Sequence, residues 1–190
     1  RESEIGVERG NVGILPWIET ASGIVNVSTI CAASDRVRWI AFGAEDFSAD
    51  MGISRTVDNE TDFAEGPYGE PGLLYARSAV AVAARAAGIQ ALDTPFVRFK
   101  DEAGLRADCS LARRIGFTGK MAIHPAQIDV IETAFMPSEQ EIERAKRVMQ
   151  ASLAAEREGR GSLSLDGEMI DAPVVARARN ILRSAGEALE

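Results

Sequence analysis

Residues 37–46 read VRWIAFGAED, a short apolar run that ends at a glycine and two acidic residues, and this stretch decides the fold class. Strands of a parallel sheet are buried on both faces, so they are short and largely apolar. Three further runs share this character: residues 12–18 (VGILPWI), 90–99 (QALDTPFVRF) and 120–124 (KMAIH). Pro16 cannot donate a ladder hydrogen bond, so its strand is predicted to lie at an edge or to end there.

Each apolar run is followed by a segment with helical periodicity, which predicts repeated βα units around a parallel sheet. The predicted helices cover residues 24–33, 73–87, 102–115 and 125–135. A closed (β/α)₈ barrel needs eight strands and typically about 250 residues, so four strands make at most half of one. Two options remain open at this point. The four strands form a small open sheet, or the first half of a barrel lies upstream of Arg1 or on another chain.

The remaining residues, 136–190, are predicted to form a helical extension. Ser138 and Glu141 have the spacing of a capping box and begin a helix that runs to about residue 158. Residues 159–169 are interpreted as a linker with a tight turn at Asp166-Gly167, and Pro173 begins a final amphipathic helix.

Composition and net charge argue against some classes of binding partner. Of the 190 residues, 46% are apolar and 26% are charged, as in a soluble globular protein, and the net charge of −8 opposes binding to nucleic acid or anionic lipid. No stretch resembles a secretory signal or a membrane span, so we expect a cytoplasmic protein. Cys31 and Cys109 lack CxxC spacing and are predicted to be buried free thiols.

Two acidic residues stand at the ends of predicted strands: Glu19 follows residues 12–18, and Asp46 follows residues 37–42. The carboxyl ends of parallel strands hold the active site in α/β folds, and two carboxylates there suit Mg²⁺, which fills its other positions with water and substrate oxygens. The alternative is that both are solvated loop acids near helix N-termini, where negative charge is mildly stabilising.

The turn Gly43-Ala44-Glu45 is a weaker signal. A glycine at a strand end allows close approach of a ligand, and neighbouring N–H groups can bind an anionic oxygen, although such glycines also occur for steric reasons alone. The long segment of residues 47–71 shows little periodicity, and a connection of this length is typically a lid or binding loop, or disordered.

Two other residues have simple structural explanations. His124, the single histidine, ends the fourth run, and its imidazole is expected to bond the backbone of a turn that could also touch substrate. Asp171 stands where the N-cap of the last helix is expected, so capping alone would account for it.

Four motifs, in this order, make the chain resemble the citrate lyase beta-subunit-like acyl-CoA lyases, a group that includes malyl-CoA, citramalyl-CoA and citryl-CoA lyases. The motifs are residues 18–23 (IETASG), 42–47 (FGAEDF) with 50–52 (DMG), 116–128 (GFTGKMAIHPAQI) and 167–173 (GEMIDAP). The resemblance covers nearly the whole chain.

The resemblance implies a (β/α)₈ barrel in which Glu19 and Asp46 hold Mg²⁺. An oxo-acid binds that metal, and N–H groups near Ala44 and Glu45 hold its carboxylate. The implied reaction is reversible cleavage of a 3-hydroxyacyl-CoA thioester to acetyl-CoA and an oxo-acid through an enolate, with coenzyme A as part of the substrate.

The resemblance also assigns the remaining motifs and implies a homo-oligomer, either a trimer or a hexamer. The turn at His124 and Pro125 matches a segment on the CoA-binding side, and Asp171 matches a proton-transfer residue that acts in a neighbouring subunit's site. Residues 1–135 would be the C-terminal half of the barrel, and residues 136–190 an extension docked on a neighbour. The family's first half, with an arginine that meets the thioester, would precede Arg1.

Two other functions remain possible from the sequence. The chain could be a non-catalytic CoA-binding or assembly subunit that retains the fold. It could also be a phosphate- or oxo-acid-binding α/β domain in which Glu19 and Asp46 are solvated.

Overall fold

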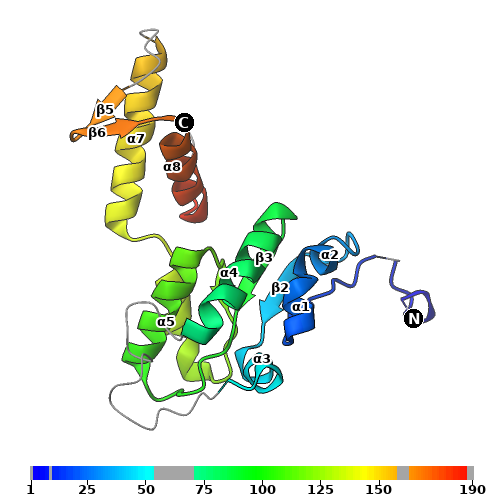
Figure 1. Ribbon diagram of the computed structural model, residues 1–190. Coiled ribbons are helices and arrows are strands. Elements are labelled where there is room, and N and C mark those ends of the chain that lie inside the picture. Colours follow the sequence, from blue (N-terminus) through cyan, green and yellow to red (C-terminus); the bar gives the residue numbers. More distant parts are fainter. Residues whose placement is uncertain (1, 9, 54–70, 158–162, 188–190) are drawn as a thin grey trace. The chain divides into compact units, whose positions relative to one another are not determined.

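The computed structural model describes residues 2–8, 10–53, 71–157 and 163–187 (Figure 1). The chain forms two compact units, Arg1–Phe135 and Met136–Glu190, which we call unit 1 and unit 2.

Unit 1 is built on a four-stranded parallel sheet whose spatial order follows the chain order. Its strands are β1 (Trp17–Ile18), β2 (Trp39–Phe42), β3 (Gln90–Asp93) and β4 (Gly119–Lys120). Each predicted apolar run overlaps one of these strands. The predicted α/β fold with a parallel sheet, as in part of a (β/α)₈ barrel, is therefore confirmed.

The strands are shorter than the apolar runs that predicted them. The first strand begins only after Pro16, which has no N–H to donate, and β1 is an edge of the described sheet, as that proline predicts. The third run leaves the sheet after Asp93 and the fourth after Lys120. Residues that follow these strand ends therefore belong to loops at the carboxyl edge of the sheet.

Helices connect the strands of unit 1. They are η1 (Ser3–Ile5), α1 (Ala21–Val25), α2 (Val27–Cys31), α3 (Ala44–Met51), α4 (Pro71–Ala86), α5 (Glu102–Ile115), η3 (Pro125–Gln127) and α6 (Ile128–Phe135). Helix α5 matches its prediction, and the helix predicted for 125–135 begins as the 3₁₀ turn η3.

One predicted helix and one predicted irregular segment were wrong in their bounds. The predicted helix 24–33 is two short helices that start earlier, because the Thr20 hydroxyl accepts a hydrogen bond from the Gly23 N–H at 3.0 Å and caps α1. The segment predicted to be irregular from residue 47 instead begins inside α3. Its remainder, residues 54–70, lies outside the described residues, and so does the predicted lid or binding loop.

The core of unit 1 lies between the sheet and its helices. In β2 only Trp39 is exposed and the other three residues are buried, as expected of a strand covered on both faces. Ile18, Ile40 and Phe42 pack into one buried cluster with the apolar side of α4. Helix α4 lies against β2 and β3 (Figure 1). Packing against α4 therefore holds the strands of the sheet in place.

Unit 2 consists of α7 (Glu139–Arg157), a hairpin of β5 (Leu163–Leu165) and β6 (Glu168–Ile170), and α8 (Ala172–Ser184). The capping box is confirmed, because the Ser138 hydroxyl accepts from the Glu141 N–H at 3.2 Å and the Glu141 carboxylate accepts from the Ser138 N–H at 2.8 Å. The tight turn is also confirmed. The residues flanking it form strands rather than a linker, because positive φ at Asp166 and Gly167 suits a two-residue hairpin turn.

Both cysteines are free and buried, as predicted. Burial raises the pKa of the Cys109 thiol to about 11 and also raises that of Cys31, so neither is a reactive thiolate at neutral pH. Among the helices in the described ranges, none combines the length and apolar character needed to cross a bilayer.

Candidate functional site

The ends of β1 and β2 bring Glu19 and Gly43 together. The two strands pair with Ile18 opposite Phe42, and the Gly43 N–H donates to the Ile18 carbonyl at 3.0 Å. A Cβ placed on Gly43 would lie 2.6 Å from both Cγ and Oε1 of Glu19. The Glu19 side chain therefore lies directly over the Gly43 backbone, in space that any other residue would occupy.

Asp46 lies in the first turn of α3, the helix that starts immediately after Gly43. Its side chain is exposed, whereas that of Glu19 is half-buried. The structure thus places the two predicted metal ligands at the carboxyl ends of adjacent paired strands. Within the described ranges, no group of three or more His, Cys, Asp or Glu side chains is arranged to hold a metal ion. Two carboxylates are nevertheless a sufficient protein contribution for Mg²⁺, which keeps water and substrate oxygens as its other ligands.

The loop that carries Glu19 is fixed from both sides. Thr20 caps α1, and the Asp50 carboxylate, near the end of α3, accepts from the Ala21 N–H at 2.8 Å. Asp50 therefore ties α3 to the residues that follow Glu19. Asp50 belongs to the motif of residues 50–52, for which no role was predicted.

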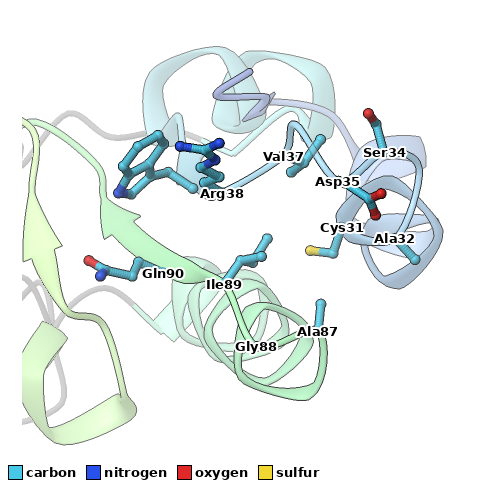
Figure 2. Close-up of a pocket in the computed structure, with 11 residues that line it drawn as sticks. Cys31, Ala32, Ser34, Asp35, Val37, Arg38, Ala87, Gly88, Ile89 and Gln90 are labelled. Atoms are coloured by element: carbon cyan, nitrogen blue, oxygen red, sulfur yellow. The ribbon is translucent and has the colours of Figure 1, made fainter. Parts of the chain in front are cut away.

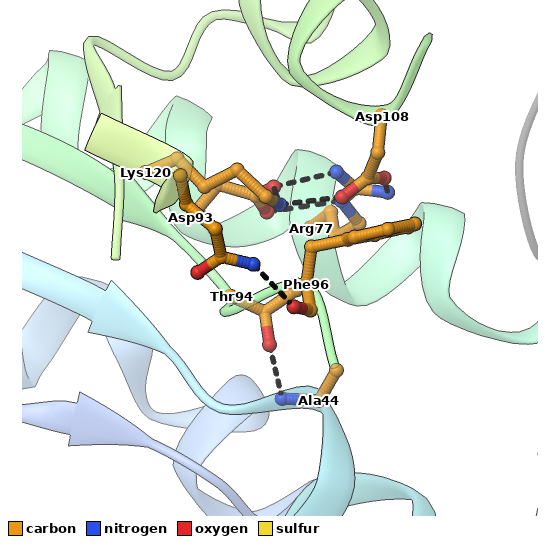
Figure 3. Close-up of polar contacts among 8 residues, drawn as sticks. Ala44, Arg77, Asp93, Thr94, Phe96, Asp108 and Lys120 are labelled. Atoms are coloured by element: carbon orange, nitrogen blue, oxygen red, sulfur yellow. Dashed lines mark hydrogen bonds and ion pairs between the residues drawn. The ribbon is translucent and has the colours of Figure 1, made fainter. Parts of the chain in front are cut away.

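The Ala44 N–H has a partner inside the protein, whereas a substrate carboxylate was expected as its partner. It donates to the Thr94 hydroxyl oxygen at 3.0 Å, and the Thr94 side chain is buried (Figure 3). This donor is already used inside the protein, whereas the resemblance implied that it would hold a substrate carboxylate. Glu45, next in the turn, is exposed.

His124 and Pro125 form an exposed turn at the end of β4. The His124 Nδ1 atom accepts from the Ala126 N–H at 3.2 Å and caps η3, which is the backbone bond expected of it. Its ring also stacks on Phe99, with centroids 4.8 Å apart and planes 23° apart. The Lys100 Nζ lies 5.8 Å from the centre of the Phe99 ring.

The buried side chain of Gln127 connects the two loops that carry the stacked rings of Phe99 and His124. This side chain is 1% exposed, donates to the Phe96 carbonyl at 2.7 Å and accepts from the Ile123 N–H at 2.9 Å. It thereby joins the loop after β3 to the loop after β4. Gln127 belongs to the motif of residues 116–128 but had no predicted role, and its signal was a polar residue three positions after the strand-end histidine.

Four charged side chains that had no predicted role form an ion network behind β3 and β4, in which three are buried and Asp108 is half-buried (Figure 3). Arg77 makes a bidentate pair with Asp93 at 3.0 and 2.6 Å and contacts Asp108 at 2.9 Å, while the Lys120 Nζ contacts Asp93 at 2.7 Å and also pairs with Asp108. Burial acts to raise the pKa of the Asp108 carboxyl, but the charges of Lys120 and Arg77 outweigh it and hold that pKa below its usual range. An aspartate inside an apolar run was the sequence signal for this network.

Asp171 lies in unit 2 and caps α8. Its Oδ1 atom accepts from the Val174 N–H at 3.1 Å, and its side chain is exposed. The capping role considered in the sequence analysis is therefore present, and it engages one of the two carboxylate oxygens.

A separate pocket of about 580 Å³ opens at the other end of the sheet (Figure 2). Its lining includes Cys31 at the end of α2, and Arg38, Trp39, Ile89 and Gln90, which lie at or directly before the first residues of β2 and β3. Ligands of parallel α/β folds bind at the carboxyl ends of the strands, so this pocket is not the candidate site.

Residues 1–125 match the protein family described as HpcH/HpaI aldolase/citrate lyase. The citrate lyase subunit beta of Leuconostoc mesenteroides subsp. cremoris is 39% identical over 184 residues, which are 97% of this chain and 57% of that protein. The mitochondrial citramalyl-CoA lyase of Homo sapiens is 34% identical over 182 residues, which are 92% of this chain and 50% of that protein. The chain thus spans about half the length of these relatives.

Solved structures of similar proteins also match this chain. A Mycobacterium tuberculosis CitE structure in complex with magnesium, acetoacetate and coenzyme A matches with a TM-score of 0.72 and 36% identity, covering 92% of this chain and 61% of that one. A citrate lyase from Burkholderia xenovorans LB400 matches with a TM-score of 0.81 and 25% identity, covering 100% of this chain and 58% of that one. These matches confirm the resemblance that the four motifs indicated.

The Gly43→Ala variant should displace the Glu19 side chain while the protein stays folded. The new Cβ meets only side-chain atoms of Glu19 and no backbone, and alanine readily adopts the Gly43 φ of −112°. We expect the free energy of unfolding to fall by less than about 1 kcal/mol. Because Glu19 must turn away, affinity for Mg²⁺ should fall about 10- to 100-fold in calorimetry.

Gly72→Ala is the matched control, because its added Cβ would make only ordinary contact, at 3.4 Å, with Ile53. It should leave Mg²⁺ affinity unchanged. If Gly43→Ala also leaves that affinity unchanged, Glu19 does not belong to a metal site.

Proposed function

The chain belongs to the HpcH/HpaI aldolase/citrate lyase family, and from this premise we propose that it carries the metal-binding part of a Mg²⁺-dependent carbon–carbon lyase. The proposed reaction is reversible cleavage of a 3-hydroxyacyl-CoA thioester, of the malyl-, citramalyl- or citryl-CoA type, to acetyl-CoA and an oxo-acid. Relatives named citrate lyase subunit beta and citramalyl-CoA lyase support this reaction class.

One observation carries the proposal: the Glu19 carboxylate lies over Gly43 where β1 and β2 end, beside the turn that bears Asp46. Glycine at this position leaves room for a carboxylate that a Cβ would exclude, so the site fits a small hard cation held by two acidic side chains. When bound there, Mg²⁺ would polarise a substrate oxygen and balance the negative charge that develops during C–C cleavage. Glu19 and Asp46 would hold it and orient the oxo-acid, assisted by the turn of Gly43, Ala44 and Glu45, in which the Ala44 N–H stays bonded to Thr94.

His124 and Pro125 are proposed to contact the coenzyme A portion of the substrate. The stacked rings of Phe99 and His124 form an exposed aromatic surface, and Lys100 adds a positive charge beside it. An aromatic surface with a neighbouring cation suits a molecule that combines an adenine ring with phosphate groups. Coenzyme A is present in the related Mycobacterium tuberculosis structure.

Asp171 is proposed to act as the general acid in the site of a neighbouring copy of the chain, donating a proton to the enolate carbon of acetyl-CoA after the C–C bond breaks. This role makes the working protein a homo-oligomer, with unit 2 docked on a neighbour. Two free buried thiols suit the cytoplasm, which we propose as its compartment.

The direct test is an acyl-CoA cleavage assay with Mg²⁺ or with a chelator. Because the match spans 57% of the Leuconostoc relative, the chain is assayed both as it stands and fused to the part of that relative that the match leaves uncovered. We expect Mg²⁺-dependent release of acetyl-CoA from at least one of the three thioesters. Binding of coenzyme A without turnover in either form would instead favour a non-catalytic CoA-binding or assembly subunit.

Mixed oligomers test the role of Asp171. Asparagine still caps a helix, so Asp171→Asn should keep its melting temperature, and turnover should fall about 10²- to 10⁴-fold because the proton donor is lost. Asp46→Asn subunits should also be inactive, since they lack a charged metal ligand. Mixing the two variants should restore activity, because some sites then pair an intact metal site with an intact Asp171.

If mixtures that are shown to exchange subunits recover no activity, Asp171 does not act in trans. If Asp171→Asn alone keeps full turnover, its role is capping only.

A further inference from the structure

We propose that Thr94 is a positioning residue for the proposed metal site, because it fixes the start of α3 and therefore the turn that carries Asp46 (Figure 3). This inference rests on the proposed function in one respect: it takes Asp46 as a metal ligand. The contacts that support it do not depend on that assignment.

The start of α3 lacks the usual local cap. Its N-cap residue is Gly43, which has no side chain and makes no capping hydrogen bond. A serine, threonine, aspartate or asparagine would normally supply such a cap. None of these residues can stand here while Glu19 keeps its position, because even a Cβ would lie 2.6 Å from the Glu19 carboxylate oxygen.

Thr94, the residue that follows β3, supplies an acceptor for a different N–H group at the start of α3. Its hydroxyl oxygen accepts from the N–H of Ala44, the first residue of α3, at 3.0 Å and across 50 positions of sequence. Thr94 is 5% exposed and Ala44 is fully buried, so water does not readily replace this hydrogen bond. Thr94 therefore fixes the first residue of a helix whose glycine N-cap makes no side-chain hydrogen bond of its own.

The residue before Thr94 is held rigidly. Asp93 ends β3, is fully buried, and pairs with both Arg77 and Lys120, which come from α4 and β4. Asp93 lies opposite Lys120 in the sheet register and on the same face as Ala91, which belongs to the core beneath the helices. The ion network therefore anchors the end of β3 from the helix-covered side of the sheet.

The network itself is not a ligand site. Its two cationic and two anionic side chains, Arg77, Lys120, Asp93 and Asp108, balance in charge and satisfy one another through the contacts in Figure 3. An anion or a metal ion would have to break one of these buried pairs. The role left for the network is to hold Thr94 at a fixed position beside Ala44.

The test compares Thr94→Val with Thr94→Ser in the whole chain. Valine keeps the shape of threonine but cannot accept a hydrogen bond, whereas serine keeps the acceptor. We measure Mg²⁺ affinity by calorimetry and hydrogen exchange of the Ala44 amide by NMR. Thr94→Val should raise the Ala44 exchange rate by about tenfold, the effect of one net hydrogen bond, and should weaken Mg²⁺ binding by about tenfold or more. Thr94→Ser should keep both the Ala44 exchange rate and the Mg²⁺ affinity within about threefold of the parent chain.

Two results would overturn the inference: unchanged Ala44 exchange in Thr94→Val, or equal losses in Thr94→Val and Thr94→Ser. The exchange measurement also separates this inference from the proposed function. If the parent chain binds no Mg²⁺ while Ala44 exchange still responds to Thr94→Val and not to Thr94→Ser, then the metal site is wrong and the positioning of α3 by Thr94 stands.

Discussion

The Glu19 side chain occupies the space beside Gly43 that any Cβ would need, and this steric constraint connects the fold to the proposed chemistry. It requires β1 and β2 to be paired in parallel with Ile18 opposite Phe42, so that Glu19 and Gly43 leave the sheet side by side. It also leaves α3 without a capping side chain. The hydrogen bond from Ala44 to Thr94 and the bond from Ala21 to Asp50 then hold the two loops in place.

The buried ion network gives these loops a rigid support. In a low-dielectric interior, each charge is tolerated because its partners are close, and removing one partner of a buried ion pair typically costs about 3–5 kcal/mol. Arg77, Asp93, Lys120 and Asp108 come from α4, β3, β4 and α5 respectively, so the network joins two strands to two helices at the carboxyl edge of the sheet. The same edge carries the exposed turn of His124.

Much of the fold could be predicted from local patterns. Short apolar runs predicted the parallel sheet, and Pro16 predicted the edge strand. The strand ends were less predictable, because apolar residues continue past Asp93 into a loop. The position of Glu19 at a strand end was visible in sequence, but the contacts of Thr94 and Gln127 were not. Those contacts join segments 31 and 50 residues apart, and such pairings depend on the tertiary fold rather than on spacing.

The most direct test of the account is a Mg²⁺ titration by calorimetry of the parent chain, Glu19→Gln and Asp46→Asn, in the chain alone and in the fusion that completes the match to the Leuconostoc relative. Both substitutions keep the shape of the side chain and remove its charge, and a hard cation prefers ionised oxygen. The account predicts saturable binding by the parent in at least the fused form, and loss of most of that affinity in each variant. Equal Mg²⁺ affinity in all three proteins would contradict it.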